Sequence, residues 1–186
     1  MANPKVDQVL NGTGPFGRSP TNPIPVNGPI GEVVYLSRLQ SFDGQPILFH
    51  RIGSSLDMVD IYETVALNGR SWDVLFLSMY FPGKSRLAPS GYTLAPTGTQ
   101  PLIYGTNMRL ANFPEALPAF IGDTTRRMFG SEFAPREVRD ALKTLPFIRP
   151  QHHQKLLDEV HGLIKGFLRP ESDPSPPGFS TYAPSD

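Results

Sequence analysis

The pattern of hydrophobic and polar positions changes once along the chain, near residue 113. From Glu32 to about Phe113, β-branched and aromatic residues are separated by turn signals such as Asp43-Gly44 and Asn68-Gly69, which is typical of several short strands. After Pro114 the apolar residues recur with helical spacing. Strands followed by helices predict an α+β fold, in which an antiparallel β-sheet (residues ~32–113) packs against C-terminal helices (~115–169).

Three helices are expected in that C-terminal part. A weaker one covers residues 115–130, and a second begins at Pro135, a residue favoured at the first helical position. The last helix follows Pro150 and has an apolar stripe broad enough to cover one face of a sheet.

The two ends of the chain differ from the part between them. Residues 1–31 contain six prolines and five glycines, which argue against a helix or an inner strand and predict an extended arm. This arm is expected to lie along its own domain or along a neighbouring subunit. Residues 170–186 are rich in proline and serine and predict a disordered tail. The expected organisation is therefore an arm (1–31), a single α+β domain (32–169) and a tail (170–186).

Asn68-Gly69, between two β-rich runs, is a strong signal for a hairpin with a two-residue type I′ turn. Counting outward from this turn pairs Glu63 with Val74 and Val65 with Trp72. The shared face is apolar apart from one carboxylate, that of Glu63. A one-residue slip of the register would turn Glu63 to the other face.

Glu63 is the candidate catalytic residue in one reading of the sequence. Beneath the helices its pKa would rise towards neutrality unless a base reaches it, and a group of that kind can act as general acid or base. The alternative is a structural ion pair, for which Arg38 or Arg51 would be the natural partner. His50, near a strand end, is the second candidate acid–base group, although an edge-strand histidine explains it equally.

Cations supply the candidate sites for an anion or an acidic partner. No acidic residue occurs between Asp73 and Glu115, an interval that contains Lys84, Arg86 and Arg109. These three residues and Arg51 are the candidate anion- or partner-binding residues. The alternative is a solvated loop, around residues 81–92, whose cations protect a sheet edge.

Composition and motifs exclude several common functions. Lysine plus arginine equals aspartate plus glutamate at 17 each, so neither nucleic acid nor a membrane surface is an expected partner. The chain has no cysteine, and the glycines at 12, 14 and 17 lack the strand and helix of a dinucleotide site. The histidines lack a metal-binding spacing. No cofactor and no metal are therefore expected.

These observations favour a soluble, cytoplasmic protein-binding or accessory domain. Its partner would be another protein or a second copy of the chain in a homodimer, engaged through the proline-rich arm and the basic loop. The alternative is a small enzyme that uses Glu63 as general acid or base. In that reading His50 or Arg51 lies at the rim of the site, and Lys84 and Arg86 orient an anionic substrate.

Overall fold

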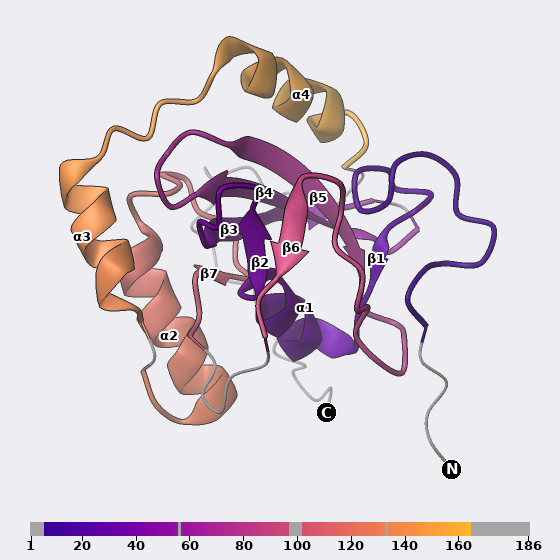
Figure 1. The fold of residues 1–186 in the computed structure, drawn as a ribbon, viewed down its shortest axis with the longest axis horizontal. Coiled ribbons are helices and arrows are strands. Elements are labelled where there is room, and N and C mark those ends of the chain that lie inside the picture. Colours follow the sequence, from indigo (N-terminus) through magenta and orange to yellow (C-terminus); the bar gives the residue numbers. More distant parts are fainter. Residues whose placement is uncertain (1–5, 56, 97–101, 133, 165–186) are drawn as a thin grey trace, which may run out of the picture.

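The computed structural model describes residues 6–55, 57–96, 102–132 and 134–164. Figure 1 shows a five-stranded sheet with helices on both faces and a separate pair of short strands. The α+β class predicted from the sequence is confirmed. The strands are β1 (Ile24–Pro25), β2 (Leu39–Ser41), β3 (Ile47–Ser54), β4 (Asp60–Ala66), β5 (Trp72–Ser78), β6 (Tyr92–Leu94) and β7 (Gly105–Thr106). The helices are α1 (Gly28–Leu36), α2 (Leu117–Phe129), α3 (Arg136–Thr144) and α4 (Gln151–His161).

The sheet has the order β1-β5-β4-β3-β7 and is mixed rather than purely antiparallel. Its three central strands, β3, β4 and β5, are antiparallel, as the hairpin signals predicted. The short strand β1 joins β5 in parallel, and β7 joins β3 in parallel. Strands β1 and β7 have only two residues each and lie in segments that contain proline or glycine. Strands this short have no recognisable alternation of hydrophobic and polar residues.

The expectation that the first 31 residues contain no strand or helix needs correction. Ile24–Pro25 forms β1, and α1 begins at Gly28 with Pro29 in its first turn. A proline in the first helical turn costs little because that turn has no intrahelical acceptor for its amide. Ile24 and Val26 have no exposed surface, so this segment is part of the core of its own domain.

The hairpin between β4 and β5 has the predicted register but a different turn. Val65 pairs with Trp72 and Glu63 with Val74. The carbonyl of Ala66 accepts from the Gly69 amide at 2.7 Å, and only Gly69 has positive φ, at 76°. A type I′ turn would require positive φ at Asn68 as well. The Ala66 amide donates to the Ser71 carbonyl at 2.8 Å, so the loop consists of residues 67–70 instead of the predicted two, and the register is unchanged.

Helices α1 and α4 cover opposite faces of the sheet (Figure 1). On one face α1 packs with Tyr62 and Leu75, and on the other Leu157 and Val160 of α4 pack with Ile61. The prediction that a C-terminal helix covers the Glu63 face is therefore confirmed. The end of the predicted last helix and the predicted tail, residues 165–186, lie outside the described residues. In the part of the chain that the structure describes, no helix combines the length and apolarity needed to cross a membrane.

Candidate functional site

Glu63 lies in the middle of β4 and faces α4, as the register predicted. Its side chain is 2% exposed. On the neighbouring strand β3, His50 is its direct cross-strand partner and is 3% exposed. The sheet thus brings together the two residues that the sequence singled out as candidate acid–base groups.

Three basic side chains bind the Glu63 carboxylate. Arg149, in the connection between α3 and α4, donates from Nε to Oε1 at 2.6 Å and from Nη2 to Oε2 at 3.0 Å. His50 Nε2 lies 2.9 Å from Oε2, and His153 Nε2, in the first turn of α4, lies 3.1 Å from Oε1. We call Glu63, His50, His153 and Arg149 the Glu63 cluster.

The hydrogen bonds of His50 define its tautomer. Its Nδ1 accepts from the backbone amide of Leu110 at 3.0 Å, so that nitrogen bears no proton. The proton is then on Nε2, which donates to Glu63. Burial lowers the pKa of His50 and outweighs the opposing effect of Glu63. His50 is therefore a neutral donor within the cluster.

Aromatic rings pack against the cluster, in which Glu63 and the two histidines are buried and Arg149 is 33% exposed. Phe113 stacks on the His50 ring with centroids 4.2 Å apart and an angle of 13° between the planes. The Arg149 guanidinium lies 5.4 Å from the centroid of the Trp72 ring and also donates to the Phe113 carbonyl at 3.2 Å. Trp72 in turn lies edge-on to Phe113 and close to His153. Burial of the Glu63 carboxylate strengthens the hydrogen bonds that it accepts, because the local dielectric constant is low.

These contacts keep Glu63 ionised. Burial alone would raise the pKa of its carboxyl, but the hydrogen bonds from His153, His50 and Arg149 outweigh burial and lower that pKa. The base that reaches Glu63 is Arg149, and the suggested partners Arg38 and Arg51 are bound elsewhere. Arg38 donates to the carbonyl of Ala95, and Arg51 pairs with Asp60. A permanently charged and enclosed carboxylate holds α4 and the preceding connection on the sheet, and it is poorly suited to exchange protons with a substrate.

The histidines of the cluster are not arranged as metal ligands. Both Nε2 atoms are at hydrogen-bond distance from oxygens of Glu63. Within the described ranges, no group of three or more histidine, aspartate or glutamate side chains could hold a metal ion.

A second buried acid, Glu32 of α1, lies on the other face of the sheet. It is 1% exposed, and its Oε2 accepts from the Tyr62 hydroxyl at 2.9 Å. Its Oε1 has no hydrogen-bond partner among the described residues. Burial, and then the neighbouring Asp60 carboxylate, raise the pKa of Glu32 to about 8. Glu32 is therefore protonated at neutral pH.

Asp60 differs from Glu32 because it has a cationic partner. Its Oδ1 accepts from Arg51 Nε at 2.8 Å and from the Ser54 hydroxyl at 2.5 Å. Arg51 also donates to Ser54. The Arg51 guanidinium is the one cation near both carboxyl groups, and it is bound to Asp60. Glu32 therefore keeps its proton. We call Glu32, Asp60, Tyr62, Arg51 and Ser54 the Glu32 cluster.

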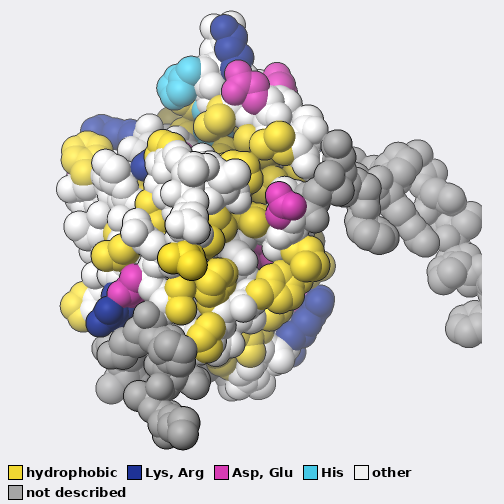
Figure 2. Space-filling view, turned by 90° about the vertical axis from the view of Figure 1, so that its right-hand side faces the viewer, with side chains coloured by type: hydrophobic (Ala, Val, Ile, Leu, Met, Phe, Trp, Pro, Cys, Tyr) yellow, Lys and Arg dark blue, Asp and Glu magenta, His cyan; other side chains and the backbone are white. Residues whose placement is uncertain are grey.

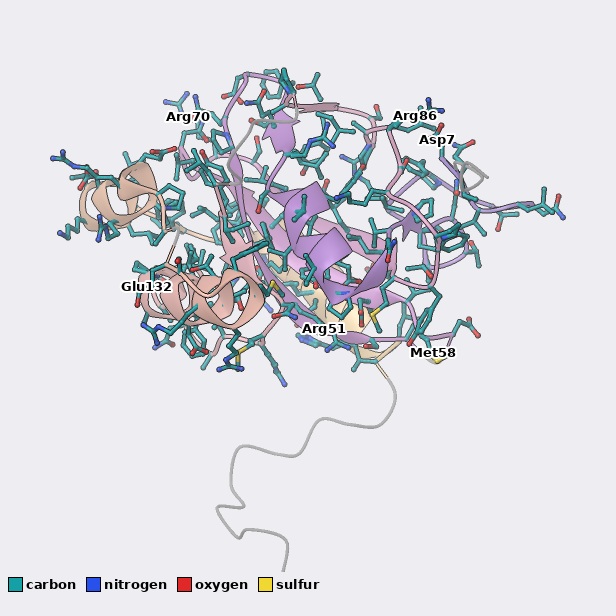
Figure 3. All side chains as sticks on the ribbon, turned by 90° about the horizontal axis from the view of Figure 1, so that it is seen from below. Asp7, Arg51, Met58, Arg70, Arg86 and Glu132 are labelled. Atoms are coloured by element: carbon teal, nitrogen blue, oxygen red, sulfur yellow. The ribbon has the colours of Figure 1, made fainter. Side chains whose placement is uncertain are left out.

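The four cations proposed from the sequence do not gather at one place. Figure 3 shows Arg86 beside Asp7 and away from Arg51. Arg86 forms an ion pair with Asp7, and Arg51 forms one with Asp60. Lys84 and Arg109 are exposed. No anion site formed by all four residues is present in the described part of the chain.

Sequence reasoning missed the residues that determine the state of each glutamate. His153 shares a helical stripe with Leu157 and Val160, and this position was the available signal that it faces the sheet. Arg149 lies 86 positions from Glu63, and no local pattern connects the two. Glu32 is the only acidic residue in an otherwise apolar helix, a signal that becomes readable only once α1 is recognised.

Comparison of the chain with protein families, with curated proteins and with solved structures found no match.

Proposed function

We propose that this chain is a cytosolic protein-binding or accessory domain. Its docking face is formed by the end of the N-terminal segment, the start of α1 and the loop that follows β5. The observation that carries the proposal is a set of exposed apolar side chains on this face: Ile30 (47% exposed), Tyr80 (59%) and Leu87 (41%).

The N-terminal segment and the loop form one continuous surface. The Phe81 amide donates to the Val26 carbonyl, and the Ser85 amide donates to the Pro25 carbonyl. The hydroxyl of the same Ser85 donates to the carbonyl of Asp7 at 2.7 Å. These bonds hold the loop in place before any partner binds, which reduces the entropy lost on association.

Helix α1 is hydrogen-bonded to the same loop. The Tyr35 hydroxyl donates to the Leu87 carbonyl at 2.6 Å, and Asn27 forms a β-bridge with Tyr80. The exposed residues of the docking face thus project from a backbone that is bonded at several points. Figure 2 views the molecule from the side on which β1 and the N-terminal segment lie, and hydrophobic side chains occupy much of that surface.

The charge of the loop indicates the chemistry of the partner. Lys84 is exposed beside the apolar residues, whereas Arg86 of the same loop already forms an ion pair with Asp7. We therefore propose a protein segment that presents apolar side chains together with a carboxylate. A second copy of this chain is the alternative occupant, and the experiment below separates the two.

Site-specific photo-crosslinking tests the proposal. A photoreactive amino acid replaces Tyr80 in the full chain, and the control carries it at Ile148, which is 75% exposed in the connection between α3 and α4. A discrete adduct at position 80 that is missing at position 148 supports the docking face. An adduct of twice the chain mass would identify self-association. Equal labelling at both positions, or none at position 80, contradicts the proposal.

The purified pair then provides a quantitative check. Replacing Tyr80 and Leu87 by serine is expected to weaken binding at least about tenfold, whereas Ile148→Ser leaves it unchanged. Equal affinities for the two variants would contradict the proposed face.

A further inference from the structure

We propose that the proton kept by the buried carboxyl group of Glu32 fastens α1 to β4, and that release of this proton loosens α1 together with the docking face that it supports. The second half of this inference rests on the function proposed above. The first half concerns the fold alone and is tested separately.

The geometry of the Glu32 cluster requires that proton. Asp60 and Tyr62 are alternate residues of β4 and face α1, where Glu32 lies. Both carboxyl groups are nearly inaccessible, with 1% of Glu32 and 4% of Asp60 exposed. Two charged carboxylates in such a place would need two cations, because an unpaired buried charge is strongly destabilising.

The cluster provides only one cation. The charged and titratable groups that face Glu32 are Asp60 and Tyr62 on β4 and Arg51 on β3. Arg51 is bound to Asp60 and Ser54, and burial, followed by the Glu32 carboxyl, raises the pKa of Tyr62 well above its ordinary value. The one cation of the cluster is therefore already bound to Asp60, and Glu32 keeps its proton.

When α1 leaves the sheet, which we call the open state, the Glu32 carboxyl group becomes hydrated. In the open state Glu32 titrates near its ordinary value of 4.5, while in the closed state its pKa is about 8. Between these two values, opening releases a proton, so each rise of one pH unit favours the open state by about tenfold. Above pH 8 the dependence ends, because the closed state has lost its proton as well.

The docking face is coupled to α1 through contacts already described. Ile30 belongs to the helix, and the Tyr35 hydroxyl holds the Leu87 carbonyl. An α1 that leaves the sheet takes both supports with it. Partner binding at this face is expected to weaken between about pH 6 and about pH 8 by the fraction of closed α1 that is lost over this range.

Hydrogen exchange of the full chain tests the inference at about pH 6 and about pH 8, with rates corrected for the intrinsic pH dependence. We compare the wild type, Glu32→Gln and the exposed control Glu115→Gln. The amides of residues 28–36 should lose at least about tenfold in protection at the higher pH in the wild type and the control, but not in Glu32→Gln. Equal pH dependence in all three proteins would overturn the proposed role of the Glu32 proton.

Two further measurements keep the test decisive. If Glu32→Gln does not fold, the wild type is judged by comparing α1 with α4: a loss of protection confined to α1 supports the inference, and a parallel loss in both helices overturns it. Crosslinking at position 80 is then repeated at both pH values. A failure of the docking proposal leaves no adduct at either pH, whereas a failure of the coupling leaves equal adducts at both while the exchange result stands on its own.

Discussion

Glu63 and Glu32 are buried to nearly the same extent on opposite faces of one sheet, yet their surroundings shift their pKa values in opposite directions. Glu63 faces Arg149 and two imidazoles, and these stabilise its charge. Glu32 faces a tyrosine hydroxyl and a second carboxyl group, which favour its neutral form. Burial thus fixes how strongly a carboxyl group responds to its neighbours, and the neighbours decide the direction.

The comparison also separates two kinds of attachment to the sheet. The Glu63 cluster holds α4 by a charged network, which is strongest when the carboxylate is ionised. The Glu32 cluster holds α1 by a network that requires a proton. The first attachment is expected to fail in acid and the second in mild alkali, so the two faces of the molecule have opposite pH dependence.

The largest effect is expected when the Glu63 charge is removed. Glu63→Gln removes the charge that Arg149 and the two histidines bind, and the free energy of unfolding should fall by about 3 kcal/mol at neutral pH, because the Arg149 side chain is 33% exposed and is partly hydrated without its partner. Urea denaturation of both proteins measures the difference. Asp123→Asn breaks the exposed pair of Asp123 with Arg127 and should cost less than about 1 kcal/mol. Equal losses in the two variants would contradict the assignment of Glu63 as a buried ion-paired residue.

The opposite result is expected for the other glutamate. A raised folded-state pKa means that the folded protein binds an extra proton between pH 4.5 and about 8, so stability falls as the pH rises through this range. Glu32→Gln removes that fall and should be more stable than the wild type by up to about 3 kcal/mol at pH 7. The advantage should disappear near pH 4.5. Denaturation midpoints over this pH range provide the measurement, and a constant difference between the proteins would be the contrary outcome.

Two adjacent histidines provide a matched test of the Glu63 cluster. His153→Ala removes a buried hydrogen bond to a charged group and should cost about 1.5–3 kcal/mol. His152→Ala changes an exposed residue of the same helix turn and should stay within about 0.5 kcal/mol of the wild type. Thermal unfolding at pH 7 distinguishes them, and similar melting temperatures for both variants would argue against the role of His153.

The smallest effect concerns the neutral donor to Glu32. Tyr62→Phe removes the hydroxyl that donates to Glu32 and should cost about 0.5–1.5 kcal/mol at about pH 5, where the glutamate is protonated. Tyr80→Phe, at an exposed tyrosine, serves as the control for the same chemical change. A Tyr62→Phe variant as stable as that control would mean that the hydroxyl contributes nothing to the cluster.

Acid lability should follow from the Glu63 cluster as well. The lowered pKa of Glu63 contributes stability that is present above its unfolded value and is lost as the pH falls through the folded value. His50 acts in the same direction, because its lowered pKa means that the unfolded chain binds a proton that the folded chain does not. The two faces therefore limit stability from opposite ends of the pH scale.

The inward position of Glu63 could be predicted because it depends on local chemistry. Asn68-Gly69 indicated the hairpin, and the alternation of side chains along each strand then placed Glu63 on the inward face. The turn type was wrong, but the register did not depend on it. His50 was recognised as a candidate for a similar reason, since its strand could be read from the sequence.

The partners of the glutamates could not be predicted in this way. Arg149 reaches Glu63 through tertiary packing of a loop, and nothing near either residue signals the other. Helix α1 was missed because Gly28 and Pro29 were interpreted as helix breakers, although a proline is well tolerated in the first turn. Because α1 was not predicted, the sequence did not show that Glu32 faces the sheet, and its proximity to Asp60 could not be predicted either.

The central claim is that the two glutamates differ in charge at neutral pH: Glu63 is an ionised carboxylate and Glu32 is a neutral carboxylic acid. Carbon-13 NMR of the side-chain carboxyl groups, with signals assigned by Glu32→Gln and Glu63→Gln, tests it directly. We predict that the Glu32 signal has the shift of a carboxylic acid at pH 7 and titrates near pH 8, whereas the Glu63 signal remains that of a carboxylate down to the acid unfolding of the chain. Two signals that both titrate near 4.5 would contradict the account.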